Sequence, residues 1–354
     1  MTANGGRCRW ILRWLALAVL LGGCGVAATA FATADTREEF PEFDDQPLDE
    51  PLGYPEWFRL SFLDIADDAR EAVANGKQGL VVYVGQKYCP YCKTLLETNF
   101  GLHDIQEYTQ RHFDVIGIDI HGSRAVTDVD GAEGSERSFA LRHKLNFTPT
   151  LLFYDGTGKE VFRLTGYYPP YQFRAALEYV ADAHYREESF RRYLERASGT
   201  MVFDTEDMNP ESFFLPPPYA LGRTHHPGER PLIVFYEQPD CHACDILHAG
   251  PLVQAEILAR LGQFESVQLN LWGKKPVITP DGLRTTERAW AEKLGLFYAP
   301  TLLFFDLNGR EILRVDSVVQ FYRLRNVLDY VASGAYKVHP TFQHWRETQG
   351  DPSK

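Results

Sequence analysis

The sequence lacks the features of a nucleic-acid-binding protein or of a domain held together by scattered disulfides. It has 36 Lys and Arg residues against 48 Asp and Glu residues, for a formal net charge of −12. This balance argues against a nucleic-acid partner, because phosphate binding requires a surplus of positive charge. Cysteine is scarce, with six residues in 354, and a structural disulfide framework would spread cysteines through a short chain. A chain of this length is expected to form two domains with separate cores.

The cysteines are concentrated in two tight pairs, Cys89-Pro-Tyr-Cys92 and Cys241-His-Ala-Cys244. Each pair stands where an apolar, β-branched run ends and a helical pattern begins. The first Cys of each pair is therefore expected at a helix N-terminus, where free backbone N–H groups and the helix dipole favour a thiolate. A thiolate attacks disulfides, and a second Cys three positions on can resolve the mixed disulfide. This spacing predicts Cys89 and Cys241 as nucleophiles and Cys92 and Cys244 as resolving residues.

Other uses of a Cys-x-x-Cys pair fit less well. A four-cysteine zinc site needs both pairs in one small module, whereas these pairs lie about 150 residues apart. Haem attachment needs a His directly after the second Cys, and Lys93 and Asp245 occupy those positions. Two inert disulfides are the alternative that the sequence leaves open. We therefore predict redox chemistry carried by the cysteines themselves, with no metal and no other cofactor.

The segments around the two pairs are copies of one another. Residues 113–122 (FDVIGIDIHG) match residues 264–273 (FESVQLNLWG), and residues 147–155 (FTPTLLFYD) match residues 298–306 (YAPTLLFFD). The matched blocks keep their spacing to within one residue, which indicates a duplicated domain. Each copy reads as strand–helix–strand followed by strand–strand–helix, an α/β pattern with helices on both faces of a sheet.

The N-terminus reads as a targeting segment. Three arginines precede a short apolar run at residues 14–21, which is followed by Gly22-Gly23-Cys24. This pattern resembles the lipobox of bacterial lipoproteins and predicts lipidation at Cys24. A signal-peptidase site at residues 32–34, or an uncleaved span over residues 14–34, is the alternative. All three interpretations place the rest of the chain outside the cytoplasm.

Composition divides the chain into five predicted segments. They are a signal or anchor segment at 1–34, an acidic tether at 35–56, a first domain at 57–196, a Pro-containing linker at 197–230 and a second domain at 231–354. The tether is expected to be solvated, with a specific docking tail as the alternative. The linker is expected to be semi-rigid, with a degenerate copy of the helix that opens the first domain as a further possibility.

The charges beside the two pairs differ. Lys87 and Lys93 flank the first pair, whereas Asp240 and Asp245 flank the second. Cations favour a thiolate and anions oppose it, so the two sites are expected to differ in reduction potential and to pass electrons from one to the other. The alternative is that both copies act independently.

With these residues in place, both repeats resemble the thioredoxin superfamily, and more closely the SoxW-type periplasmic thioredoxins. The resemblance rests on the Cys pairs, on Thr148-Pro149-Thr150 and Ala299-Pro300-Thr301, and on longer loops at 121–134 and 272–284. It implies two consecutive thioredoxin-like folds of the α/β class, each with a central mixed sheet and helices on both faces. It also implies that Pro149 and Pro300 are cis and that they, with Thr148 and Ala299, position the substrate backbone beside the cysteines.

The sequence departs from the family at one informative position. The acidic residue that thioredoxins commonly carry six positions before the first Cys is Tyr83 in one copy and Phe235 in the other. Proton transfer during exchange must then depend on water or on another group.

The resemblance implies an exported thiol–disulfide oxidoreductase that reduces protein disulfides on the periplasmic side of a bacterial membrane. Its partners would be protein thiols and disulfides, the membrane through a lipid or N-terminal anchor, and a membrane thiol-transporting reductase as electron donor. A disulfide oxidase or isomerase is one alternative. A membrane-tethered binding or assembly protein with redox-regulated Cys pairs is another.

Overall fold

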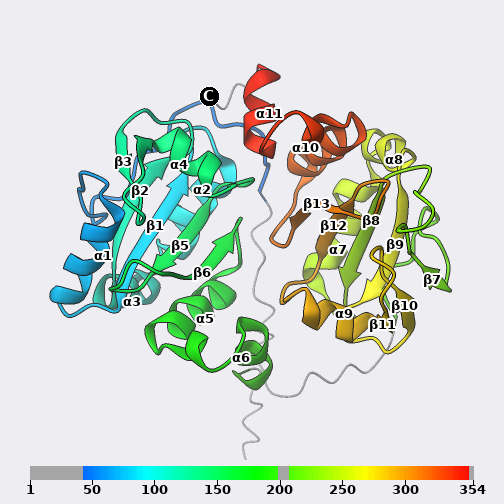
Figure 1. The fold of residues 1–354 in the computed structure, drawn as a ribbon, viewed down its shortest axis with the longest axis horizontal. Helices are drawn as coiled ribbons and strands as arrows, with labels where there is room; N and C mark the ends of the chain where they lie inside the picture. The colour runs from blue at the N-terminus through cyan, green and yellow to red at the C-terminus, as the bar shows by residue number, and fades with distance from the viewer. Residues whose placement is uncertain (1–42, 198–206, 351–354) are drawn as a thin grey trace, which may run out of the picture. The chain divides into compact units, whose positions relative to one another are not determined.

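Two four-stranded mixed sheets, one in each repeat, form the framework of the computed structural model, which describes residues 43–197 and 207–350 (Figure 1). Their strand orders are β2-β1-β5-β6 and β9-β8-β12-β13, so the two repeats have the same topology. The first two strands of each sheet are parallel and the others antiparallel. This confirms the predicted α/β fold class of two thioredoxin-like folds.

The elements of the first repeat follow the predicted order. They are α1 (Ile65–Ala74), β1 (Gly79–Gly85), α2 (Pro90–Thr94), the π-helical turn η1 (Leu95–Asn99), α3 (His103–His112), β2 (Phe113–Asp119), β3 (Ala125–Thr127), β4 (Glu133–Ser135), α4 (Glu136–Arg142), β5 (Thr150–Tyr154), β6 (Glu160–Thr165), α5 (Pro170–Ala181), η2 (His184–Arg186) and α6 (Phe190–Ala197).

The second repeat matches the first from its first long strand onward, but in the described residues it begins with a two-residue strand where the first repeat has a helix. It consists of β7 (Tyr219–Ala220), β8 (Leu232–Glu237), α7 (His242–Ala249), η3 (Pro251–Val253), α8 (Ala255–Leu261), β9 (Glu265–Asn270), β10 (Pro276–Ile278), β11 (Arg284–Thr286), α9 (Glu287–Lys293), β12 (Thr301–Phe305), β13 (Glu311–Val315), α10 (Phe321–Ala332), η4 (Ala335–Lys337) and α11 (Phe342–Thr348).

The strand that leads into each Cys pair is buried on both faces. In β1, Val81 and Tyr83 face one apolar cluster, while Val82 and Val84 face the other. This follows from the period of two along a strand, and it explains why the run is continuously apolar instead of alternating. The strand β8 is buried along its whole length in the same way. The strand that ends at each Cys pair is therefore fixed in position by two cores.

The long loops that the sequence predicts after β2 and β9 fold into small hairpins. In the first repeat β3 pairs with β4, and in the second β10 pairs with β11. A buried carboxylate, Asp128, accepts hydrogen bonds from Arg142 and His143 at 2.8 Å each and ties the first hairpin to the end of α4. These insertions are ordered parts of their domains.

The predicted solvated tether is wrong for residues 43–56, which we call the N-terminal arm. Backbone N–H groups of Leu48 and Leu52 donate to the carbonyl oxygens of Tyr88 and Lys87 at 3.1 and 2.7 Å. Asp45 is only 6% exposed. Although the segment is acidic overall, its apolar residues Phe43 and Leu52 pack against the core of the first repeat. The arm is therefore part of the fold.

The predicted linker is also wrong for its described part, residues 207–230. The strand β7 pairs in parallel with β10, and the Leu215 N–H donates to the carbonyl oxygen of Ser266 at 2.8 Å. Arg223 is 4% exposed and donates to Glu265 at 2.6 Å. These contacts build the segment into the second domain, and residues 207–230 contain a two-residue strand and no helix. The copy of the opening helix is therefore not found there.

The N-terminal targeting segment, with Cys24, lies outside the described residues. Among the helices within 43–197 and 207–350, none has the length and apolar character needed to cross a membrane.

Candidate active site

The first Cys pair lies where β1 gives way to α2. Cys89 is the N-cap of α2, and its Sγ accepts a hydrogen bond from the backbone N–H of Cys92 at 3.0 Å. Pro90 occupies the first helical turn, where its missing N–H is not needed. The two cysteines are joined as a disulfide. A sulfur at this position faces the donors of a helix N-terminus, which favour negative charge on it after reduction.

The second pair has the same local geometry. Cys241 is the N-cap of α7, its Sγ accepts from the Cys244 N–H at 3.1 Å, and the pair forms a disulfide. In both pairs the first Cys is the more exposed, at 1% against 0% and at 7% against 1%. The difference is clear only in the second pair, where the predicted attacking residue, Cys241, is the more exposed.

A cis proline lies beside each pair, as the resemblance implies. The Thr148–Pro149 and Ala299–Pro300 peptide bonds are both cis. The Thr148 Oγ1 lies 3.4 Å from the Cys89 Sγ, and the Ala299 carbonyl oxygen lies 3.6 Å from the Cys241 Sγ. The structure thus brings the four cysteines and the four predicted substrate-positioning residues into two matching groups. A third cis bond, Pro217–Pro218, is not expected from the sequence.

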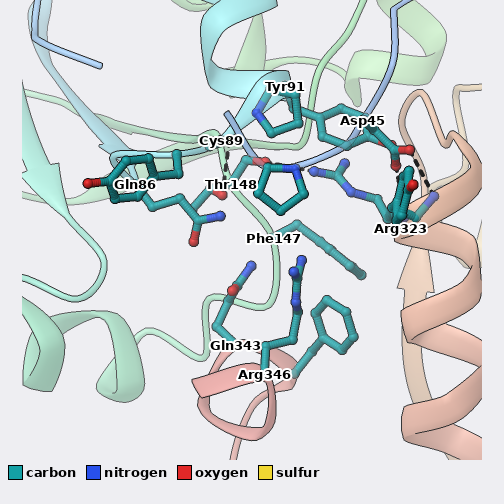
Figure 2. Close-up of a pocket in the computed structure, with 14 residues that line it drawn as sticks. Asp45, Gln86, Cys89, Tyr91, Phe147, Thr148, Arg323, Gln343 and Arg346 are labelled. Carbon is teal, nitrogen blue, oxygen red and sulfur yellow. Dashed lines mark hydrogen bonds between the residues drawn. The ribbon is translucent and has the colours of Figure 1, made fainter. Parts of the chain in front are cut away.

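The first site is covered by groups from outside its own repeat. Cys89 borders a pocket lined by the N-terminal arm, the first repeat and the second repeat, including Asp45, Gln86, Thr148, Arg323, Gln343 and Arg346 (Figure 2). The Nη2 of Arg323 donates to the Thr148 carbonyl oxygen at 2.8 Å, and its guanidinium stacks over the Tyr91 ring at 3.3 Å. Burial lowers the pKa of Arg323. Arg323 of the second repeat thus occupies the carbonyl oxygen of Thr148, a residue predicted to position the substrate backbone.

The N-terminal arm completes this cover through Asp45. Its carboxylate accepts a hydrogen bond from the Tyr91 hydroxyl at 2.8 Å and from the backbone N–H groups of Tyr322 and Arg323 at 2.8 and 2.7 Å. The Tyr91 hydroxyl in turn accepts from the Gln320 N–H at 2.9 Å. Burial and the nearby Asp45 carboxylate raise the pKa of Tyr91. No sequence signal marked Asp45 or Arg323, because their partners lie far away in the chain.

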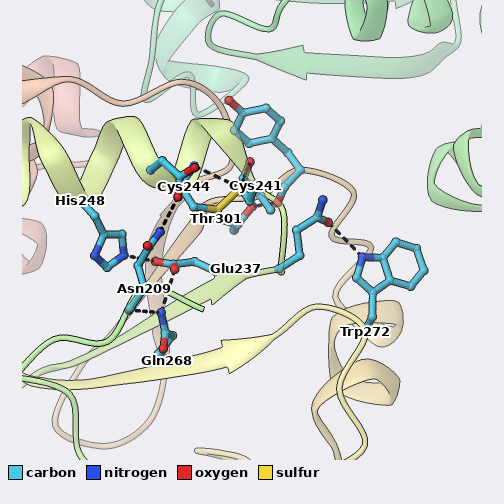
Figure 3. The surroundings of a disulfide bond; sticks show 12 residues. Asn209, Glu237, Cys241, Cys244, His248, Gln268, Trp272 and Thr301 are labelled. Carbon is cyan, nitrogen blue, oxygen red and sulfur yellow. Dashed lines mark hydrogen bonds and ion pairs between the residues drawn. A yellow bond between two sulfur atoms is a disulfide. The ribbon is translucent and has the colours of Figure 1, made fainter. Parts of the chain in front are cut away.

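The second site contains a buried polar group that the sequence analysis also missed. Glu237, at the end of β8, is 0% exposed. Its Oε1 lies 3.0 Å from the Nε2 of His248 on α7, and its Oε2 accepts from the Gln268 side chain at 2.8 Å (Figure 3). The signal for it was a single Glu closing the apolar run LIVFYE. Thioredoxins commonly carry their acidic residue six positions before the first Cys, whereas Glu237 stands four positions before Cys241.

Two of the four charges predicted to distinguish the sites, Lys93 and Asp245, have side-chain partners of their own. The Lys93 Nζ lies 4.0 Å from the Glu97 carboxylate, and the Asp245 carboxylate accepts from the Asn209 side chain at 2.9 Å.

No cluster of three or more His, Cys, Asp or Glu side chains is arranged to hold a metal ion in residues 43–197 and 207–350.

Several solved structures resemble this chain. A thioredoxin-fold protein from Helicobacter pylori is 24% identical, covers 35% of this chain and 86% of its own, and has a TM-score of 0.31. A thioredoxin from Thermus thermophilus is 23% identical over 33% of this chain and 84% of its own, with a TM-score of 0.27. A protein disulfide oxidoreductase from Aeropyrum pernix K1 is 15% identical over 80% of this chain and 97% of its own, with a TM-score of 0.24. No curated protein matches the sequence.

The sequence model of one family matches the chain twice. The thioredoxin-like domain model covers residues 65–181 and residues 219–332, and each match contains one Cys pair and one of the two site prolines. Two Cys-x-x-Cys pairs in such domains indicate thiol–disulfide oxidoreductase chemistry in general. The chain therefore belongs to the thioredoxin-like domain family and carries two of its domains in tandem.

Proposed function

We propose that the protein is an exported thiol–disulfide oxidoreductase that reduces protein disulfides through its two Cys pairs. The observation that carries this proposal is the duplicated arrangement of an N-capping Cys, a resolving Cys three positions on and a cis proline beside them. Neither pair needs a further cofactor, because the two electrons come from the cysteine thiols.

The reaction follows from this arrangement. In the reduced protein, the thiolate of Cys89 or Cys241 attacks one sulfur of a substrate disulfide, and the other substrate sulfur leaves as a thiolate. The thiolate of Cys92 or Cys244 then attacks the mixed disulfide. The protein disulfide forms, and the second substrate thiolate is released. A membrane thiol-transporting reductase would return the site to the dithiol state by the same exchange.

Export and membrane attachment rest on the N-terminal sequence. The basic residues, the short apolar run and Cys24 support a lipid anchor on the periplasmic side of the membrane. Palmitate labelling of the wild-type chain and of a Cys24→Ala variant tests this part. Loss of label in the variant is the expected result, whereas equal labelling contradicts the lipid anchor.

An insulin-reduction assay tests the activity. The wild-type chain should reduce insulin, each of Cys89→Ala and Cys241→Ala should retain part of that activity, and the double variant should be inactive. Wild-type protein that binds a partner tightly but reduces no insulin would favour a binding or assembly role. The redox state of the cysteines in the cell tests the direction: mostly reduced pairs agree with a reductase, and mostly oxidised pairs indicate an oxidase.

A further inference from the structure

The second site holds a buried acid–imidazole pair for which the first site has no counterpart. Strand register makes Glu237 equivalent to Gly85, and it makes Gln268 equivalent to Gly117. His248 lies four residues after its resolving Cys, and Leu96 stands at that position in the first site. The positions of the three polar side chains that meet beneath α7 are therefore occupied by two glycines and a leucine in the first repeat.

This network lies on the buried face of α7 that also carries the resolving cysteine. Cys244 and His248 are one helical turn apart and are 1% and 7% exposed, so both point inward from the same face. The carboxylate of Glu237 binds the inner ring nitrogen of His248. Figure 3 shows Glu237 and His248 grouped with Cys244 below the helix.

The fold itself does not require this charge. In the first site a Cβ on Gly85 would come within 2.7 Å of the Tyr83 hydroxyl, so the phenol fills this region. Burial raises the pKa of Tyr83, so the phenol keeps its proton near neutral pH and cannot accept one from the resolving thiol. A fully buried carboxylate is costly unless it is paired. The first domain forms the same sheet without one, so the cost in the second domain calls for a role other than folding.

Thiol–disulfide exchange supplies such a role, because the resolving thiol must lose its proton before it can attack. We propose that Glu237 accepts the Cys244 proton, directly or through one water, and that His248 holds the carboxylate in place. Cys244 then attacks the mixed disulfide, forms the Cys241–Cys244 bond and releases the substrate thiolate, while the proton stays on Glu237. The inference rests on the proposed function and names the group that accepts the proton of the resolving thiol.

The charges around the pair are consistent with this assignment. Burial alone would lower the pKa of His248, but the carboxylates of Glu237 and Glu211 outweigh burial and raise it. The His248 ring lies between two carboxylates, with its Nδ1 2.9 Å from the Glu211 Oε1 and its Nε2 3.0 Å from the Glu237 Oε1. The groups that face this network come from three elements: His248 and Asp245 on α7, Gln268 on β9, and Asn209 and Glu211 from the segment before β8.

An internal proton acceptor makes the release step of the second site insensitive to pH, and this can be compared with the first site. The full-length chain would be prepared with only site 2 (Cys89→Ser, Cys92→Ser) or only site 1 (Cys241→Ser, Cys244→Ser). Each reduced protein is mixed with a peptide disulfide, quenched with acid and analysed by mass spectrometry for the mixed disulfide. Release at site 1 should speed up about tenfold per pH unit between about pH 6 and pH 8, as the thiolate fraction does, whereas release at site 2 should stay nearly constant. Equal slopes at the two sites overturn the proposal.

A substitution at Glu237 provides a second test of the proposal. In the site-2 chain, Glu237→Gln should slow release at least about tenfold near pH 6, while attack by Cys241 and release near pH 9 stay unchanged. Glu256→Gln, the same change on the exposed surface of α8, is the matched control. A folded Glu237→Gln protein with an unchanged pH profile overturns the proposal. If that variant does not fold, the comparison of the two unaltered sites decides.

The same data separate this inference from the proposed function. A site-2 chain that forms no mixed disulfide at any pH contradicts the proposed function, and the inference falls with it. A chain that forms and resolves the mixed disulfide with equal pH dependence at both sites contradicts the inference alone.

Discussion

Arg323 donates a hydrogen bond to the carbonyl oxygen of Thr148, the residue that precedes cis Pro149 beside Cys89. A side chain of the second repeat thus takes the backbone acceptor that a substrate is predicted to use at the first site. The other terminal guanidinium nitrogen, Nη1, is buried without a hydrogen-bond partner among the described residues. An unsatisfied buried donor costs free energy, so the contact that covers the site is less stable than its short distance implies.

Arg323→Ala should therefore make Cys89 more reactive. If the hydrogen bond to Thr148 contributes about 1 kcal/mol to the covered arrangement, its loss raises the open population about fivefold. The rate at which reduced Cys89 reacts with a bulky maleimide measures this, in a chain with the second Cys pair changed to Ser. Arg325→Ala, two residues along the same helix, is the control. Equal rates for the two variants would show that Arg323 does not cover the site.

Asp45→Ala should destabilise the protein. The Asp45 carboxylate accepts three hydrogen bonds in a buried position, and removing it leaves three donors without their acceptor. We expect a loss of about 3 kcal/mol and a fall in Tm of about 5 °C or more by calorimetry. Asp44→Ala is the matched control, because the Asp44 carboxylate binds Gln46 two residues on and should leave Tm unchanged. A fall below about 1 °C for Asp45→Ala would mean that the N-terminal arm is not part of the folded domain.

His143 should make stability depend on pH. Burial opposes its charge, but its hydrogen bond to Asp128 and its ion pair with Glu160 raise the pKa from 6.5 to about 9, while that of Asp128 falls to about 2. Because the folded pKa is the higher one, the contribution of His143 is complete below about pH 6.5 and is lost as the pH rises through about 9. We expect His143→Gln to cost on the order of 1 to 3 kcal/mol more at pH 6 than at pH 9.5, by urea unfolding. The exposed His103→Gln should show no such difference, and a pH-independent cost at His143 would contradict the ion pair.

The two Cys pairs should differ in reduction potential. The site flanked by Lys87 and Lys93 is expected to stabilise its reduced form and so to have the higher potential, whereas Asp240 and Asp245 oppose a thiolate at the other. Each potential can be measured in a glutathione buffer with the other pair changed to Ala. Potentials within about 15 mV of each other, or ~0.7 kcal/mol for two electrons, would exclude an electron relay between the sites.

The local part of each site could be predicted from sequence because its causes are local. The apolar run before each Cys pair gives a strand buried on both faces, and the small motif Cys-x-x-Cys opens a helix directly after it. The repeated blocks at residues 147–155 and 298–306 located the next strand of each repeat for the same reason. Because the same patterns occur in both repeats, each of these assignments is supported by two independent segments.

The long-range part could not be predicted, since no local pattern encodes it. Asp45 stands in an acidic segment that reads as solvated, and its burial depends on donors nearly 280 residues away. Glu237 is a single charge at a strand end. Its partners His248 and Gln268, and Glu211 on the far side of the His248 ring, meet only when α7, β9 and the segment before β8 pack together. The SoxW-type subtype, the direction of electron flow and the membrane anchor stay predictions.

Trapping of the mixed disulfide tests the central claim, that both Cys pairs carry out thiol–disulfide exchange with Cys89 and Cys241 as nucleophiles. In a chain with Cys92→Ala and Cys244→Ala, the reduced protein should form stable mixed disulfides with insulin. Peptide mapping should place them at Cys89 and at Cys241. Absence of a mixed disulfide at both residues, in a chain shown to be folded and reduced, would contradict the account.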